Sequence, residues 1–219
     1  METIPPGKNI VTRISFLSES TFVLRFTREN IEFRAGQHII VGLSGDPDQR
    51  EYSIYSGEND DFLEILVREV RQGKISPKLG ECKPGDLLQV NGPFGTFGIE
   101  PYNRYSKKNV FIATGTGISP FHSMIKSYPG MDYTMIHGVS HTSEAYDRSE
   151  YDPDRYILCT SREKSTGFNG RVTGFIKSFR TAPGSSYFLC GNGSMIYEVS
   201  HILMDKGIPV ENIQTEIYF

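Results

Sequence analysis

The sequence predicts a two-domain protein, an antiparallel β-barrel followed by an α/β domain with a parallel sheet. Up to Gly92, short apolar or alternating runs are separated by turn-forming residues and interrupted by one short helix, which is typical of a small barrel. After Gly98, apolar strands alternate with helical segments, as in a doubly wound sheet. The stretch 101–108 is polar and carries no period. We therefore expect domains over residues 1–101 and 108–219.

The barrel elements follow from strand-length runs bounded by Gly, Pro, Asn and Asp. The expected strands cover 9–16, 21–26, 37–43, 50–56, 62–70 and 86–90, with a short helix over 76–79.

The second domain is expected to contain five strands, over 110–114, 133–139, 155–160, 186–190 and 213–218. Helices are expected from residue 120, over 172–179 and over 194–206, with a polar and partly helical piece near 142–148. In the 194–206 helix, one apolar face is formed by Met195, Ile196, Val199, Ile202 and Leu203, and Gly207 ends the helix. Ligands of such sheets bind beyond the carboxyl ends of the strands, where Gly115, Ser161 and Cys190 fall.

Composition excludes several classes of protein. The net charge of −3 argues against a general nucleic-acid binder, and no apolar run is long enough to span a bilayer. The N-terminus lacks an export signal, so we expect a reduced cytoplasm. The three cysteines are too scattered for a metal cluster, and the five histidines have no ligand spacing, so we read the latter as packing or surface residues and expect no metal. The histidines are His38, His122, His137, His141 and His201.

The stretch 109–121, NVFIATGTGISPF, combines a buried strand, a glycine turn and a helix start. Ser119 suits the helix N-cap and Pro120 the first helical position. A helix start after a glycine turn offers backbone N–H groups to an anion, so we predict a phosphate site. The spacing is neither G-x-G-x-x-G nor a Walker A loop, and a turn with glycines for close packing is the alternative.

A second stretch of the same design lies upstream, where Gly73, Lys74 and Ile75 precede Ser76 as a candidate N-cap and Pro77. Two such helix starts suggest two phosphate-bearing ligands.

A third candidate is Arg50-Glu51-Tyr52-Ser53, at the start of an expected strand. Alternation places Arg50 and Tyr52 on one face, which combines a phosphate-binding guanidinium with a ring that stacks on a flat ligand. Ser53 adds a hydroxyl. The alternative is a surface arginine beside a half-buried tyrosine.

Arg-x-Tyr-Ser on a barrel strand, followed about twenty residues later by Gly-x-Ile-Ser at a helix start, resembles the flavin motif of the ferredoxin–NADP reductase family. The resemblance extends over nearly the whole chain through four further segments: Gly92-Pro93-Phe94-Gly95, the 113–120 loop, Cys190-Gly191-Asn192 and Glu216-Ile217-Tyr218-Phe219. It implies that FAD binds through Arg50, Tyr52, Ser53, Gly73, Lys74, Ile75 and Ser76. It also implies that the nicotinamide dinucleotide binds through Thr114, Gly115, Thr116, Gly117, Gly191 and Asn192.

By the same resemblance Ser161, Arg162 and Arg171 mark a preference for NADP(H), because a 2′-phosphate needs cations and hydroxyls. Glu163 either faces solvent or pairs with Arg171. Cys190, read by composition alone as a small buried hydrophobe, is placed by the resemblance in the nicotinamide pocket, orienting C4 against flavin N5.

The carboxyl-terminal residues are the remaining catalytic candidates. Glu216 is expected to assist proton or hydride geometry, or is an edge-strand carboxylate. The chain resembles a bacterial subgroup with an extended ending, in which Tyr218 stacks on the flavin and Phe219 lies near the adenine, or the reverse.

The expected function is electron transfer between NADPH and a one-electron carrier, ferredoxin or flavodoxin, by a monomer that binds its carrier transiently. Candidate cations for docking an acidic carrier are Arg68, Arg71, Lys74 and Lys78. Two alternatives are a NADH-dependent reductase of flavin, quinone or an oxygenase component, and a non-catalytic flavin or nucleotide sensor.

Overall fold

The computed structural model describes residues 8–182 and 184–218, which form two compact units. The first unit runs to Gly98 and also contains the helix α2, Ser119–Ser127. The second unit comprises Ile99–Ile118 and the described chain from Tyr128 onward. The domain boundaries expected from the sequence, 1–101 and 108–219, place α2 in the second domain and stay a prediction. No helix among the described residues is both long and apolar enough to cross a membrane.

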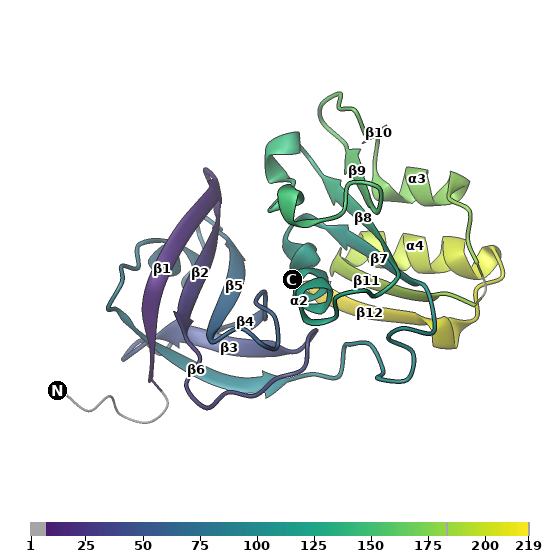
Figure 1. Cartoon of the computed structure of the whole chain (residues 1–219). Helices are drawn as coiled ribbons and strands as arrows, with labels where there is room; N and C mark the ends of the chain where they lie inside the picture. Colours follow the sequence, from purple (N-terminus) through teal and green to yellow (C-terminus); the bar gives the residue numbers. More distant parts are fainter. Residues whose placement is uncertain (1–7, 183, 219) are drawn as a thin grey trace. The chain divides into compact units, whose positions relative to one another are not determined.

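The first unit is an antiparallel barrel with strand order β4-β3-β6-β1-β2-β5 (Figure 1). Its elements are β1 (Lys8–Ser18), β2 (Thr21–Thr27), β3 (His38–Leu43), β4 (Arg50–Ser53), β5 (Phe62–Arg68), α1 (Ser76–Gly80) and β6 (Leu87–Phe94). The two edges are joined by an antiparallel bridge between Ile54 and Ile65, beside a hydrogen bond from Tyr55 N–H to Glu64 O of 2.7 Å. The joined edges close the barrel.

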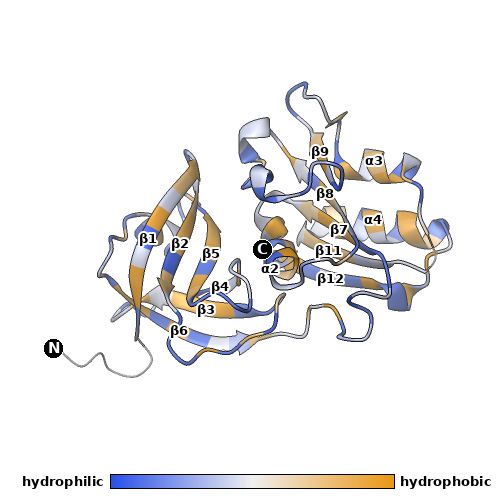
Figure 2. Ribbon diagram, in the orientation of Figure 1, coloured by the Kyte–Doolittle hydropathy of each residue, from blue (hydrophilic) through white to orange (hydrophobic). Residues whose placement is uncertain are grey.

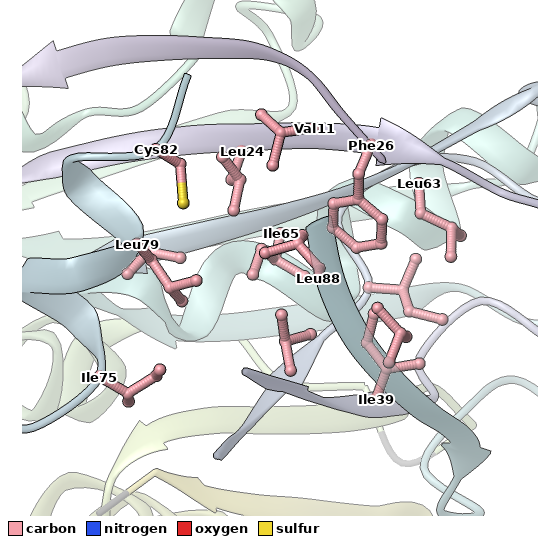
Figure 3. Close-up of a cluster of buried hydrophobic side chains, with 14 of the residues drawn as sticks. Val11, Leu24, Phe26, Ile39, Leu63, Ile65, Ile75, Leu79, Cys82 and Leu88 are labelled. Atoms are coloured by element: carbon pink, nitrogen blue, oxygen red, sulfur yellow. The ribbon is translucent and has the colours of Figure 1, made fainter. Parts of the chain in front are cut away.

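The barrel core is formed by one face of each strand and by α1. Hydrophobic and hydrophilic residues both occur along β1 and β2 in Figure 2, and in β2 residues 21–24 and Phe26 are buried. Figure 3 shows Ile75, Leu79 and Cys82, from and beside α1, in the same cluster as Leu24 and Ile65. Burying each such aliphatic side chain stabilises the fold by about 1.5–3 kcal/mol, so α1 is held in place by its packing.

Helix α2 packs on the segment that follows β4. His122 Nδ1 donates to Tyr55 O at 2.7 Å and its ring stacks on that of Tyr55 with centroids 3.7 Å apart. Ser123 Oγ donates to Ser56 O at 2.6 Å. At the far end Lys126 Nζ lies 3.0 Å from Asp60 Oδ2. These contacts explain why α2 groups with the barrel.

The second unit is a parallel sheet with strand order β10-β9-β8-β7-β11-β12, with α3 packed on β8 and α4 on β11 and β12 (Figure 1). Its elements are β7 (Asn109–Thr114), η1 (Gly115–Ile118), β8 (Tyr133–Val139), η2 (Thr142–Glu144), η3 (Arg148–Glu150), β9 (Tyr156–Thr160), β10 (Phe168–Asn169), α3 (Val172–Ser178), β11 (Ser186–Asn192), α4 (Gly193–Asp205), η4 (Val210–Asn212) and β12 (Ile213–Tyr218). From β7 the next strands of the chain, β8 to β10, are added on one side, and β11 and β12 are added on the other. The neighbouring strands β7 and β11 are therefore the topological switch point of the sheet.

The predicted fold class, a barrel followed by a parallel α/β sheet, is confirmed. The largest differences from expectation are in β4, β6 and β10. β4 ends at Ser53 rather than at residue 56, because the chain leaves β3 there and bridges to β5. β6 continues to Phe94, and the two-residue strand β10 is too short to give a sequence pattern.

Candidate functional site

The barrel unit presents the predicted Arg-x-Tyr-Ser residues on β4, where they are paired with β3. Arg50 lies opposite Val41 and is exposed, whereas Ser53 is buried. Tyr52 is half-buried against the barrel core, and burial raises its pKa to about 12 against the opposing effect of the Arg50 charge. The Tyr52 hydroxyl therefore stays protonated near neutral pH, and Arg50 supplies the positive charge of this tetrapeptide.

The second barrel candidate, 73–76, is folded tightly on itself. Gly73 N–H donates to Val70 O at 2.6 Å, and Ser76 Oγ accepts from Val70 N–H at 3.0 Å. A Cβ on Gly73 would lie 2.9 Å from Val70 O, so only glycine fits. The prediction that Ser76 is the N-cap was wrong. Ile75 holds that position and Ser76 begins α1, because its hydroxyl is used to close the 70–76 turn.

Three ion pairs tie α1, and Lys74 just before it, to the loop between β3 and β4. Lys78 Nζ pairs with Asp46 Oδ2 and lies 3.8 Å from Asp48 Oδ2, and Lys74 Nζ lies 3.7 Å from Asp48 Oδ1. The hydrogen bond from Lys78 lowers the pKa of Asp46, and the same bond raises that of Lys78. Two of the four cations suggested for carrier docking are thus already paired with carboxylates.

In the parallel-sheet unit, the ends of β7 and β11 are pressed together at the switch point. Asn192 N–H donates to Thr114 Oγ1 at 3.0 Å. A Cβ on Gly117 would lie 2.4 Å from Cys190 O, and one on Gly191, at φ +125°, would lie 2.4 Å from Thr114 Oγ1. These glycines are therefore required for close packing of backbone on backbone.

The loop after β7, which is predicted to bind a phosphate, differs from expectation at its helix start. Residues Gly115–Ile118 form the 3₁₀ turn η1, and α2 begins directly at Ser119, which is buried. The prediction that Ser119 is an N-cap outside the helix was wrong, because helical backbone already begins four residues earlier. Asn192, in contrast, caps α4, since its Oδ1 accepts from Ser194 N–H at 3.0 Å and from Met195 N–H at 3.3 Å.

Cys190 and Glu216 face each other across β11 and β12. They are register partners, and Cys190 Sγ donates to Glu216 Oε2 at 3.8 Å. Cys190 is fully buried, and burial, followed by the Glu216 charge, raises the pKa of its thiol well above the ordinary value. A hydrogen bond with Tyr218 works in the opposite direction. The sulfur is a neutral thiol, which suits a packing role beside a ligand rather than nucleophilic attack. Phe219 lies outside the described residues.

The predicted phosphate-binding cations follow two adjacent strand ends. Thr160 of β9 pairs with Asn169 of β10, and Gly170 N–H donates to Thr160 O at 2.7 Å, so Arg162 and Arg171 both follow this edge. Both arginines are exposed, and within the described part of the chain neither guanidinium forms an ion pair. Ser161 is also exposed, and its Oγ donates to Val139 O at 3.3 Å.

The carboxylate of Glu163 does not neutralise Arg171. Its Oε1 accepts from Thr142 N–H, and its Oε2 lies 3.8 Å from His141 Nδ1. The Thr142 hydrogen bond lowers the pKa of Glu163. The acid is thus directed to the loop after β8, and the two arginines remain available for an anion.

His137 is a buried packing residue, as the sequence reading allowed, but its two ring hydrogen bonds were not predicted. His137 is fully buried on β8, with Nε2 2.8 Å from Gly115 O and Nδ1 2.7 Å from Tyr156 Oη. A histidine inside the apolar strand YTMIHGV is the signal that could have found it.

Comparison with known proteins identifies the class of protein to which the barrel unit belongs. Residues 8–99 match the family model described as "Oxidoreductase FAD-binding domain". The barrel unit is therefore the FAD-binding domain of an oxidoreductase.

The full chain extends this match. It is 33% identical to a flavodoxin/ferredoxin–NADP reductase of Rhodobacter capsulatus, over 96% of this chain and 78% of the relative. The chain belongs to the ferredoxin–NADP reductase family.

Two further matches show how broad the similarity is. The toluate 1,2-dioxygenase electron transfer component of Pseudomonas putida is 26% identical over 94% of this chain, which spans 66% of that relative's length. The crystal structure of a ferredoxin NADP+ reductase from Neisseria gonorrhoeae with bound FAD and NADP has a TM-score of 0.85 at 23% identity, covering 97% of this chain and 98% of that one. The second match shows a shared fold.

Proposed function

We propose that this protein binds FAD on its barrel unit and NADP(H) on its parallel-sheet unit, and passes electrons between NADPH and ferredoxin or flavodoxin. Bound FAD supplies the chemistry, because a flavin accepts a hydride in one step and releases electrons singly. The family membership and the FAD-binding domain match support the proposal. A cytoplasmic location and a monomeric state stay predictions.

The residues of the barrel fit a dinucleotide phosphate group. Arg50 presents an exposed guanidinium on a paired strand, and the turn at Gly73 has a close backbone approach that a side chain would fill. Tyr52 and Ser53 add a protonated phenol and a hydroxyl next to Arg50. In the proposal these residues, with Lys74, Ile75 and Ser76, bind and orient FAD.

The residues of the parallel sheet fit a pyridine dinucleotide at the switch point. Thr114 ends β7, and Gly115, Thr116 and Gly117 follow in the loop where parallel sheets bind their ligands. Gly191 and Asn192 lie at the end of the adjacent strand β11. The neutral Cys190 thiol and the Glu216 carboxylate, joined by a hydrogen bond, are proposed to orient the nicotinamide with Tyr218.

The preference for NADPH over NADH is inferred from the exposed guanidinium groups of Arg162 and Arg171. Both are exposed beside Ser161, and the nearby acid Glu163 bonds to Thr142 N–H instead of to either arginine. Two guanidinium groups that form no ion pair in the described part of the chain suit a 2′-phosphate, whereas an acidic side chain suits a free 2′-hydroxyl.

The test is an anaerobic titration of the FAD-loaded protein with NADPH and NADH, followed by loss of the visible flavin absorbance. We expect reduction at much lower NADPH than NADH concentrations. The double variant Arg162→Gln/Arg171→Gln should weaken NADPH binding by about 10²- to 10⁴-fold, because each of the two lost charged hydrogen bonds contributes about 1.5–3 kcal/mol, and should leave NADH binding nearly unchanged. Arg13→Gln, an exposed arginine of β1, is the matched control. Equal reduction by both nucleotides in the wild type would exclude the NADPH preference.

The similarity to the toluate dioxygenase component favours one second candidate, a reductase of an oxygenase component. The reduced protein should be mixed with purified ferredoxin, flavodoxin and a Rieske-type oxygenase. Rapid electron transfer to the oxygenase alone would favour the second candidate. A protein whose bound flavin resists both nucleotides would be a sensor instead.

A further inference from the structure

Two buried side chains, His137 of β8 and Tyr156 of β9, connect the interior of the parallel sheet to the loop after β7. His137 Nε2 lies 2.8 Å from the carbonyl oxygen of Gly115, and His137 Nδ1 lies 2.7 Å from the hydroxyl of Tyr156. His137 is completely buried and Tyr156 is 6% exposed. All three residues belong to the second unit.

The directions of these hydrogen bonds follow from their chemistry. A carbonyl oxygen only accepts, so His137 Nε2 carries a proton and donates to Gly115 O. Burial lowers the pKa of His137 to about 4, so the ring is neutral near pH 7 and Nδ1 carries a lone pair. Burial also raises the pKa of Tyr156, whose protonated hydroxyl therefore donates to Nδ1. The Gly115 carbonyl thus sets the tautomer, and the Tyr156 hydroxyl stabilises it by donating to Nδ1.

The restraint acts on one particular peptide bond. Gly115 has φ +55°, in the left-handed region, and a Cβ there would meet no atom within 4 Å. Space alone would therefore allow a side chain at Gly115, and the backbone conformation is what requires glycine. In a trans peptide the C=O and the following N–H point in opposite directions. With Gly115 O held by His137, the N–H of Thr116 is directed away from β8.

The loop is thus fixed from two sides. Gly117 packs directly on the backbone of Cys190, where a Cβ would come within 2.4 Å of the carbonyl oxygen. His137 holds the other end through Gly115 O. We propose that Tyr156 and His137 are positioning residues that set the orientation of the Gly115–Thr116 peptide for binding the diphosphate group of the nicotinamide dinucleotide. This inference rests on the proposed function of the loop.

The test uses four variants of the FAD-loaded protein. His137→Leu removes the donor to Gly115 and Tyr156→Phe removes the hydroxyl that stabilises the tautomer, whereas His137→Gln keeps an N–H close to the position of Nε2. The control is Tyr187→Phe, because Tyr187 is a buried tyrosine of β11 whose hydroxyl bonds to Ala182 and Ser185, at the opposite end of its strand from the loop.

Two ligands are compared by calorimetry, NADP+ and 2′-AMP. The latter carries a 2′-phosphate but lacks the diphosphate. We expect His137→Leu and Tyr156→Phe to lower the affinity for NADP+ about tenfold, which is the effect of losing one hydrogen bond to a charged group. Both variants should leave the affinity for 2′-AMP unchanged. His137→Gln should recover most of the NADP+ affinity, and Tyr187→Phe should affect neither ligand. A general loss of structure would weaken both ligands together.

Nitrogen-15 spectra of the histidine ring provide a readout that does not depend on the ligand. The wild type should show the proton on Nε2 of His137, and Tyr156→Phe should shift the ring toward the other tautomer. Unchanged NADP+ affinity in Tyr156→Phe and His137→Leu would overturn the inference while leaving the proposed function intact. Failure of the wild type to bind NADP+ or NAD+ would overturn both.

Discussion

The candidate site of the barrel unit consists mainly of side chains, whereas that of the parallel-sheet unit consists mainly of backbone. On the barrel, the groups expected to bind a ligand are largely side chains, with Arg50 and Lys74 exposed on a strand and a turn held by other residues. On the parallel sheet, the loop is backbone packed against backbone, and Gly117 and Gly191 leave no space for a Cβ. A side-chain site can lose a group without losing its fold, whereas a backbone site changes shape when an atom is added.

The largest effect should come from adding atoms to the backbone site. Gly117→Val places a Cβ 2.4 Å from Cys190 O, and we expect a loss of about 3 kcal/mol or more in the free energy of unfolding together with loss of NADP+ binding. Gly184→Ala is the control, because a Cβ there meets no atom within 4 Å and its φ lies outside the left-handed region. Denaturant titration and calorimetry provide the measurements. A Gly117→Val protein with wild-type NADP+ affinity would contradict the comparison.

The second effect is a pH dependence that belongs to the parallel-sheet unit. Burial lowers the pKa of His137 from 6.5 to about 4, against the Gly115 hydrogen bond and the Glu144 charge, which both raise it. Between these two values the unfolded chain binds a proton that the folded chain does not. Folding stability should therefore fall as the pH decreases from about 6.5 to about 4, by roughly 3 kcal/mol in total.

His137→Gln provides the matched comparison for this pH dependence, since it has no titrating ring. Unfolding free energies at several pH values between 4 and 7 should give a smaller slope for His137→Gln than for the wild type. Identical slopes would show that His137 is not a buried neutral histidine.

A smaller effect is expected from truncating the side-chain site. Arg50→Gln should lower the affinity for FAD by about 10- to 100-fold, because a charged hydrogen bond contributes about 1.5–3 kcal/mol. The melting temperature of the flavin-free protein should change little. Fluorescence titration with FAD measures the affinity, and Arg13→Gln is again the control. A melting temperature that falls as far as in Gly117→Val would remove the distinction between the two units.

The smallest effect should come from the ion pair between Lys78 and Asp46. Its lysine side chain is 42% exposed, and exposed ion pairs contribute little because water and salt screen them. Asp46→Asn should therefore lower FAD affinity only slightly, and added salt should reduce the difference from the wild type. Reversing the pair in Asp46→Lys/Lys78→Asp should restore the affinity if the pair acts by holding α1 to the β3–β4 loop. A reversed pair with much weaker FAD binding would indicate that Lys78 itself binds the cofactor.

Much of the fold could be predicted from local patterns. The strands over 21–27, 133–139 and 213–218 and the helix that ends before Gly207 lie within a residue of expectation, because alternation, helical period and turn residues are local properties of the chain. The candidate binding residues on β4, and at the ends of β7 and β11, were found from motifs, and their roles stay predictions until ligand binding is measured.

The features that could not be predicted depend on contacts between distant residues. The sequence by itself determined the order of the elements and the position of the two glycine-containing turns. Only the tertiary structure placed Ser76 Oγ on Val70, turned Glu163 to Thr142, packed α2 on Tyr55 and brought His137 under Gly115. The physical reason is that a hydrogen bond is directional and short: a sequence shows that a serine, glutamate or histidine can form one, and only the folded chain decides which partner lies within reach.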